Sequence, residues 1–355
     1  MLRIIEVVSA IALTIAFFLV VGLFLPKTAH VQRKVEIGNP ISQVYAALNG
    51  FHRFADWSPW AATDPGMNVA RSGERLGVGA RIDFTASEGG KAGVGNLQVT
   101  ASRLKQSEAL IRMSLENDWA GRNKRSSFRL VEDGKTRAVN LQWDVRIDYG
   151  WNLLGRFKGM YLDGNLGEDM EASLQRFATF MATVPLIDYS QMGIEEVERY
   201  GGPILYVGGG VPIAPRKWDD IALPLMERSW KQVEVFMSSK GISASGPKLR
   251  IINIVGEEAV DASMAYPVAA ADFTPSGNVR IGTAYQGKAL AVVYRRARAG
   301  IGAPRGPREA LRAYALTNGY EFAWDGVGQF EEWITDADEQ TGWPETRVYL
   351  PVAFK

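Results

Sequence analysis

The chain has 355 residues, with 40 Lys and Arg against 39 Asp and Glu, so its net charge is +1 at neutral pH. This balance gives no reason to expect a nucleic acid partner, and two short basic runs, 123–127 and 294–300, are interpreted as solvated loops. The sequence contains no cysteine and only two histidines, His30 and His52, which argues against disulfides, thiolate chemistry, a Ser-His-Asp triad and a multi-histidine metal site. We therefore expect neither a metal site nor a cofactor.

The first segment is apolar. Residues 7–25 carry no charge, and their number matches the roughly 20 residues that a helix needs to cross a bilayer. A cleavable signal peptide is the alternative, but its apolar core is normally shorter and a small-residue cleavage site would follow it. Residues 1–27 are therefore predicted to be a single-pass transmembrane anchor. Lys27, Arg33 and Lys34 follow it and favour soluble domains on the cytoplasmic side.

Residues 28–184 are predicted to form an antiparallel sheet around a long C-terminal helix. A strand is expected at 30–37, and a short helix over 39–49 begins at Asn39 and Pro40. Apolar and polar residues alternate strictly over 141–149, which is typical of a strand with one buried face. An apolar stripe with helical spacing predicts the long helix, from about residue 163 to residue 182.

This order resembles the START-like superfamily, specifically its polyketide cyclase/dehydrase (SRPBCC) branch. The residues that carry the resemblance are His30, Val31, Arg33, Ile37, Pro40, Val44, Leu48, Trp57 and Trp60. The resemblance implies a helix-grip fold with a cavity for a hydrophobic ligand. Some members are enzymes and many are carriers, so it does not imply a particular activity.

Two features after the first helix have alternative interpretations. Trp57 and Trp60 are predicted ligand contacts that would gate the cavity, or they close the end of the core as packing residues. Asp56 and His52 form an acid–base couple, or they are a surface pair in a helical turn.

Residues 185–355 are predicted to form a second domain after a linker at 183–193, and its pattern occurs twice. Strand, helix, strand and closing strand are expected at 202–210, 215–239, 249–254 and 265–270, and again at 290–296, 307–316, 330–336 and 349–354. Each helix ends near a glycine, as left-handed C-caps require. The repeat predicts two related halves with helices on one face of the sheet.

This layout resembles the GyrI-like effector-binding domain. The motif consists of Phe330, Glu331, Trp333 and Asp336, followed by "TRVYLPV" at 346–352. Many members have a Gly-Pro-Tyr turn where this chain has Arg295, Arg296 and Ala297, so the resemblance does not extend to a shared ligand class.

Glu331 and Trp333 are two residues apart, so both side chains leave the same face of their strand. The resemblance implies that this face lines a ligand cleft. Glu331 would then contact a lipophilic cation or act as a general base, because burial raises the pKa of a carboxylate. The structural alternative is that Glu331 pairs with a buried arginine or tyrosine. Tyr206 is predicted as a cleft partner or a core residue, and Tyr285 and Tyr294 are further candidates.

These features predict a membrane-anchored protein that binds, senses or transfers hydrophobic small molecules or lipids. Two alternatives from other classes stay open: a hydrolase or lyase that uses Glu331 as its base, and an interaction protein that inhibits a partner. The sequence shows no DNA-binding helix-turn-helix, and it identifies no protein partner.

Overall fold

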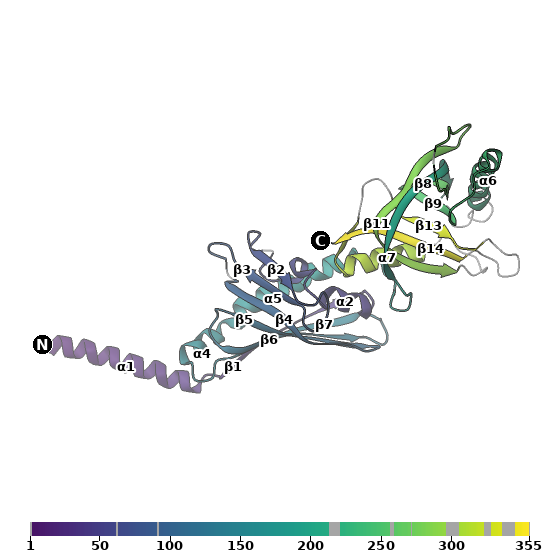
Figure 1. The fold of residues 1–355 in the computed structure, drawn as a ribbon. Coiled ribbons are helices and arrows are strands. Elements are labelled where there is room, and N and C mark those ends of the chain that lie inside the picture. Colours follow the sequence, from purple (N-terminus) through teal and green to yellow (C-terminus); the bar gives the residue numbers. More distant parts are fainter. Residues whose placement is uncertain are drawn as a thin grey trace. The chain divides into compact units, whose positions relative to one another are not determined.

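The computed structural model describes residues 2–61, 63–90, 92–212, 221–255, 259–270, 272–295, 305–322, 328–335 and 345–354. Within these ranges the chain is a mixed α+β protein, as predicted, and it divides into two compact units, Met1–Val184 and Pro185–Lys355. Each unit has its own sheet and helices (Figure 1).

The chain begins with one long apolar helix, α1 (Leu2–Phe24). Its segment Val7–Phe24 is long and apolar enough to cross a membrane, and almost none of it is buried in the protein. A signal sequence at this position would have the same properties. The predicted apolar helix is confirmed by α1, and its role as an anchor stays a prediction.

The first unit contains a seven-stranded antiparallel sheet. Its strands are β1 (Thr28–Ile37), β2 (Asn68–Ser72), β3 (Arg81–Thr85), β4 (Val94–Leu104), β5 (Glu108–Asn117), β6 (Arg122–Glu132) and β7 (Val139–Asp148), in the order β1-β7-β6-β5-β4-β3-β2. Every second residue of β7 is buried, as its alternating sequence predicts.

Four helices complete this unit: α2 (Ile41–Leu48), α3 (Phe54–Trp57), α4 (Leu153–Met160) and α5 (Leu162–Ala182). The last is the predicted long helix, and it packs against β1. Its buried stripe includes Leu166, Met170, Leu174, Phe177 and Met181, which share one helical face.

The basic run at 123–127 is not a loop, because these residues belong to β6. Lys124 points to the buried side of that strand, where its ammonium donates a 2.8 Å hydrogen bond to the carbonyl of Asn117. Burial lowers the pKa of Lys124. The loop interpretation was wrong because it relied on the charge of the segment alone. The strand forms because β6 pairs with both β5 and β7.

The second unit has the order strand, helix, strand, strand, and then strand, helix, three strands. Its elements are β8 (Glu195–Pro212), α6 (Leu223–Lys240), β9 (Lys248–Val255), β10 (Ala259–Pro267), β11 (Arg280–Arg295), α7 (Arg305–Thr317), β12 (Tyr320–Phe322), β13 (Phe330–Trp333) and β14 (Glu345–Phe354). The symmetry of the two halves stays a prediction.

The sheet of the second unit closes on itself. Its strand order is β11-β8-β10-β9-β13-β14-β12, and β11 also pairs with β14. Six strands therefore form a ring with a small apolar interior that includes Ala265, Ala289, Ala291, Phe330 and Tyr349. Helices α6 and α7 pack on the other face, where Trp230 of α6 contacts Trp333, and Leu311 of α7 packs in a cluster with Val348.

Glycines follow both of these helices, as predicted. Gly241 ends α6 with φ 64°, and Gly319 follows α7 with φ 73°. Both backbones are left-handed, a conformation that glycine adopts without a steric penalty.

Candidate functional site

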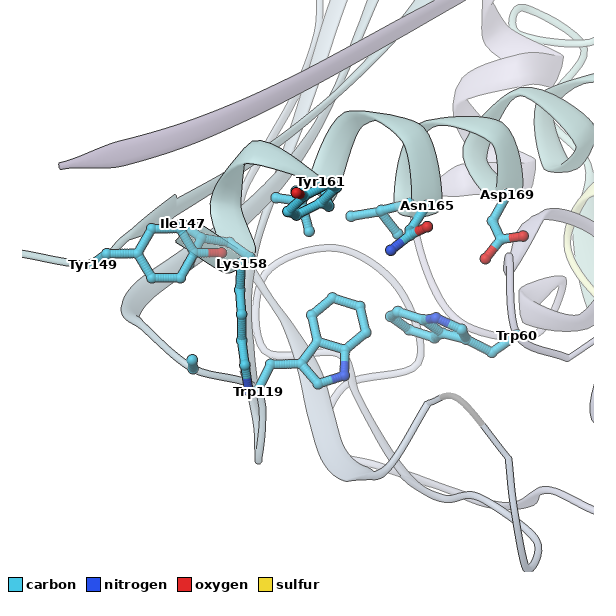
Figure 2. A pocket seen from close by; sticks show the side chains of 11 residues that line it. Trp60, Trp119, Ile147, Tyr149, Lys158, Tyr161, Asn165 and Asp169 are labelled. Atoms are coloured by element: carbon cyan, nitrogen blue, oxygen red, sulfur yellow. The ribbon is translucent and has the colours of Figure 1, made fainter. Parts of the chain in front are cut away.

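A cavity of about 600 Å³ lies between the sheet and the helices of the first unit. Most of its lining is aromatic or aliphatic. The residues are Trp60, Trp119, Ala120, Ile147, Tyr149, Lys158, Tyr161, Leu162, Asn165, Leu166 and Asp169. In Figure 2 the indoles of Trp60 and Trp119 lie on one side, opposite the α5 side chains Asn165 and Asp169. The volume falls within the roughly 300–1,000 Å³ typical of small-molecule sites.

Local structure explains how these residues meet. Ile147 and Tyr149 are two residues apart at the end of β7, so they share its inner face. Tyr161, directly before α5, and Asn165 and Asp169 within it recur every four residues and therefore line one side of the helix. The two indoles contact each other edge to face, with their ring centroids 5.7 Å apart.

The structure separates the two tryptophans that the sequence grouped. Trp57 is only 2% exposed and packs edge to face against Phe54, Phe128 and Trp143 in the core. Trp60 is 6% exposed but lines the cavity, and its ring contacts that of Phe84 with 5.3 Å between the centroids. This placement favours a packing role for Trp57, and a ligand contact by Trp60 stays a prediction.

The cavity lining carries one ammonium, from Lys158, and one carboxylate, from Asp169. Burial raises the pKa of Tyr149, so its phenol stays protonated at neutral pH. An apolar lining with a few polar groups at one side is suited to orienting an amphiphilic molecule. His30 lies instead on the outer face of the sheet, 2.8 Å from Asp144.

Sequence reasoning missed most of this lining. The available signal was the polar pair Asn165 and Asp169, spaced by one helical turn immediately beside the apolar stripe of α5. Polar residues border the apolar stripe of any amphipathic helix, so this signal alone does not identify a cavity.

Glu331 occupies a different environment from the predicted open cleft. In the register of the ring, Arg250 of β9 and Val348 of β14 lie directly opposite it, so the three share one face. That face is covered by the helices. Glu331 is 1% exposed, and its carboxylate lies 2.6 Å from guanidinium nitrogens of both Arg250 and Arg308, the latter on α7.

The two guanidinium groups determine the charge of this carboxylate. Burial alone would raise the pKa of Glu331, but the positive charges and hydrogen bonds of Arg250 and Arg308 outweigh it and lower the pKa. Burial lowers the pKa of Arg250 to about 10, so both partners are charged at neutral pH. This shift is opposite to the one that a general base near neutrality needs.

The carboxylate of the next residue, Glu332, points into the interior of the closed six-stranded sheet. Glu332 pairs with Arg199 and accepts a 2.5 Å hydrogen bond from the phenol of Tyr349. The ring of Tyr349 stacks on Phe330 at 4.6 Å. Burial, and then the hydrogen bond to Glu332, raise the pKa of Tyr349. The aromatic surroundings predicted for Glu331 are thus found around Glu332.

The other residues that the sequence proposed for a functional site lie at separate places in the structure. Tyr206 packs against the ring interior, and Tyr285 lies near Phe330 there and donates to the carbonyl of Lys288. Tyr294 lies near the end of β11, where its carbonyl is 3.4 Å from the Thr346 hydroxyl. Asp56 lies 3.5 Å from Arg53, in a partly buried pair within one helical turn. Asp336, Arg296 and Ala297 lie outside the described residues.

Among the residues that the structure describes, no group of three or more His, Asp or Glu side chains is arranged to hold a metal ion.

The first unit matches a known family. Residues 28–182 match the family model described as "Polyketide cyclase / dehydrase and lipid transport". This confirms the predicted resemblance for that part of the chain, which is less than half of its length. No curated protein is similar enough in sequence to match the chain.

Solved structures show more distant similarities. The C-terminal domain of EcmrR is 16% identical and covers 46% of this chain and 99% of its own, with a TM-score of 0.38. A truncated norcoclaurine synthase from Thalictrum flavum is 12% identical and covers 44% and 96%, with a TM-score of 0.34. A hypothetical protein from Helicobacter pylori is 13% identical and covers 43% and 87%, with a TM-score of 0.33. Such similarities carry no assignment of function.

Proposed function

We propose that the chain is a membrane-anchored binding protein that holds a lipid or another hydrophobic small molecule in the cavity of its first unit. The observation that carries this proposal is the cavity itself, with its aromatic lining and its few polar groups along α5. The family description for residues 28–182 includes lipid transport, which supports the ligand class. The apolar helix α1 supports the anchor.

The cavity supports a binding function because its lining is mainly apolar, with an ammonium from Lys158 and a carboxylate from Asp169. Asp169 and Lys158 can orient a polar headgroup, and the indoles can contact an apolar chain. The hydrolase alternative needs an available carboxylate at Glu331, and the two arginines already engage that group. For Glu331 we propose a structural role in joining α7 to the sheet.

Photolabelling tests the cavity directly. The full chain in membranes is irradiated with a fatty acid that carries a diazirine, and labelled peptides are identified by mass spectrometry. We expect label within residues 162–169 of α5, which line the cavity, and also on α1, where label reports contact with the bilayer. Label confined to α1 would contradict the cavity proposal and leave the anchor standing.

Two variants of α5 sharpen this test. Asn165→Trp places an indole at a position that lines the cavity, and Glu168→Trp places the same side chain at an exposed position of α5 outside that lining. We expect Asn165→Trp to abolish cavity labelling and Glu168→Trp to leave it unchanged. Equal labelling of both variants would show that the ligand lies elsewhere.

A further inference from the structure

An exposed apolar surface lies beside the C-terminal end of α1. It is formed by residues 149–161, which comprise α4 and the turn before it. Trp151 is 75% exposed, Leu154 is 78% exposed and Tyr161 is 68% exposed, and Met160 is also exposed. Large apolar side chains exposed together in this way mark an interaction surface.

This surface is fixed to α1 by direct contacts. The buried guanidinium of Arg156 donates to the carbonyls of Gly22 and Leu23 at 3.1 Å and of Leu25 at 3.3 Å. These carbonyls belong to the last turn of α1 and the residue after it, where helical partners are lacking. Phe157 contacts Phe18 edge to face, with 5.8 Å between ring centroids. Residues 149–161 therefore lie beside the end of the apolar helix.

The chemistry of the surface matches the boundary between lipid and water. Residues 149–161 contain no acidic residue and carry Arg156 and Lys158. The ammonium of Lys27 lies 5.1 Å from the ring centroid of Trp151. Tryptophan, tyrosine and lysine gather at that boundary because each combines an apolar body with a polar end.

We propose that residues 149–161 lie in the membrane interface and open the cavity toward the bilayer. Tyr149, Lys158 and Tyr161 belong both to this segment and to the cavity lining. A hydrophobic ligand would then pass between bilayer and cavity without crossing water. The inference rests on the proposed anchor and deepens it, because it identifies the lipid surface as the source of the ligand.

A matched pair of labelled variants tests the proposal. The chain has no cysteine, so Leu154→Cys and Leu104→Cys each create a single labelling site. Leu104 is also exposed, and it lies at the opposite end of the sheet. Strand pairing aligns Leu104 with Ala109, Leu130 and Leu141 on the successive strands β5, β6 and β7. Leu141 is seven residues, or roughly 23 Å, from Asp148 at the other end of β7, where residues 149–161 begin. Each full-length variant is labelled with an environment-sensitive fluorophore and reconstituted in phosphatidylcholine vesicles.

Doxyl-labelled phosphatidylcholine serves as the membrane quencher and iodide as the water-phase quencher. We expect the label at residue 154 to emit at shorter wavelength, to lose most of its fluorescence to the doxyl lipid and to resist iodide. The label at residue 104 should show the reverse. Alkaline carbonate extraction, performed in parallel, reports on the anchor.

The outcomes separate the two proposals. A chain that resists extraction but whose label at 154 is quenched only by iodide overturns the interface proposal and leaves the anchor intact. A chain that carbonate extracts overturns both. Disulfide cross-linking of unlabelled Leu154→Cys between two copies would assign the surface to a second copy of the chain and likewise overturn the proposal.

Discussion

Arg250, Glu331 and Arg308 form a buried group of three charges with a net charge of +1. Such a group needs every member, because an ion left alone in a low-dielectric interior is costly. The arrangement also disfavours a cationic ligand, since the carboxylate that would attract it is already neutralised. The same contacts join three elements, β9, β13 and α7.

Replacing Glu331 is therefore expected to destabilise the second unit. In Glu331→Gln the two guanidinium groups stay close together without a counter-charge, and breaking a buried pair costs about 3–5 kcal/mol. Hydrogen exchange measured by mass spectrometry should show faster exchange in peptides that cover β9 and β13. Glu309→Gln is the control, because its pair with Arg312 is partly exposed and such pairs contribute about 0–1 kcal/mol. Equal exchange in both variants would contradict the structural role.

The contribution of Glu331 should also depend on pH. Its folded-state pKa is below the ordinary value of 4.5, so the unfolded chain binds its proton more readily. The stabilisation is thus fully present above about pH 4.5 and is lost as the pH falls through the folded-state pKa. The difference in exchange between the wild-type chain and Glu331→Gln should narrow when both are compared at pH 3.5 instead of pH 7. A difference that grows on acidification would refute this linkage.

The sequence alone predicts which side chains of β13 share a face, but it does not predict which face the helices cover. The spacing of Glu331 and Trp333 correctly places them on one face. Both faces of β13 carry an aromatic residue, Phe330 on one and Trp333 on the other, so the sequence does not show which side the helices cover. That choice depends on contacts with Trp230 and Arg308, which are distant in the chain.

Among the elements, α1 and α4 are joined by the hydrogen bonds of Arg156 and by the apolar contact of Phe18 with Phe157. Arg156 is buried and also donates to the carbonyl of Gly150 at 2.6 Å, so it joins the turn before α4 to the end of α1. A helix C-terminus favours a cation at this position because its last carbonyls carry partial negative charge.

We expect Arg156→Ala to loosen this junction. Hydrogen bonds to a charged group contribute roughly 1.5–3 kcal/mol, and the carbonyls left behind are partly buried. Exchange should accelerate in peptides covering residues 20–30 and 149–157. Lys105→Ala, which removes an exposed cation next to Leu104 at the opposite end of the sheet, should leave these peptides unchanged. Slow exchange in Arg156→Ala would mean that apolar packing alone holds α1 to α4.

Elements with a strong local pattern were the predictable ones. The alternation of β7 and the apolar stripe of α5 each identify the element and its buried face. The closure of the second sheet was not predictable, because it depends on β11 pairing with β8 along one part and with β14 along another. The cavity lining depends in the same way on Trp119, which is far from α5 in the chain.

At the scale of the whole molecule, each unit has its own core. Residues 185–193 belong to the second unit, because Tyr189 is buried there and its hydroxyl lies 2.6 Å from that of Thr317. Burial raises the pKa of this phenol.

The second unit is therefore expected to fold alone. A fragment of residues 185–355 should unfold cooperatively on heating, as followed by circular dichroism, because its apolar clusters are complete within it. A fragment that begins at residue 195 lacks Tyr189 and should unfold at a lower temperature. A fragment 185–355 without a cooperative transition would show that the second unit needs the first.

Native mass spectrometry of the full-length chain, released from its own membranes, shows most directly whether the first unit holds a ligand. We expect a copurified lipid or other hydrophobic molecule, one per chain, which Glu168→Trp retains and Asn165→Trp loses. A chain that is empty when released and stays empty after incubation with membrane lipids would contradict the claim that the cavity of the first unit is a lipid-binding site.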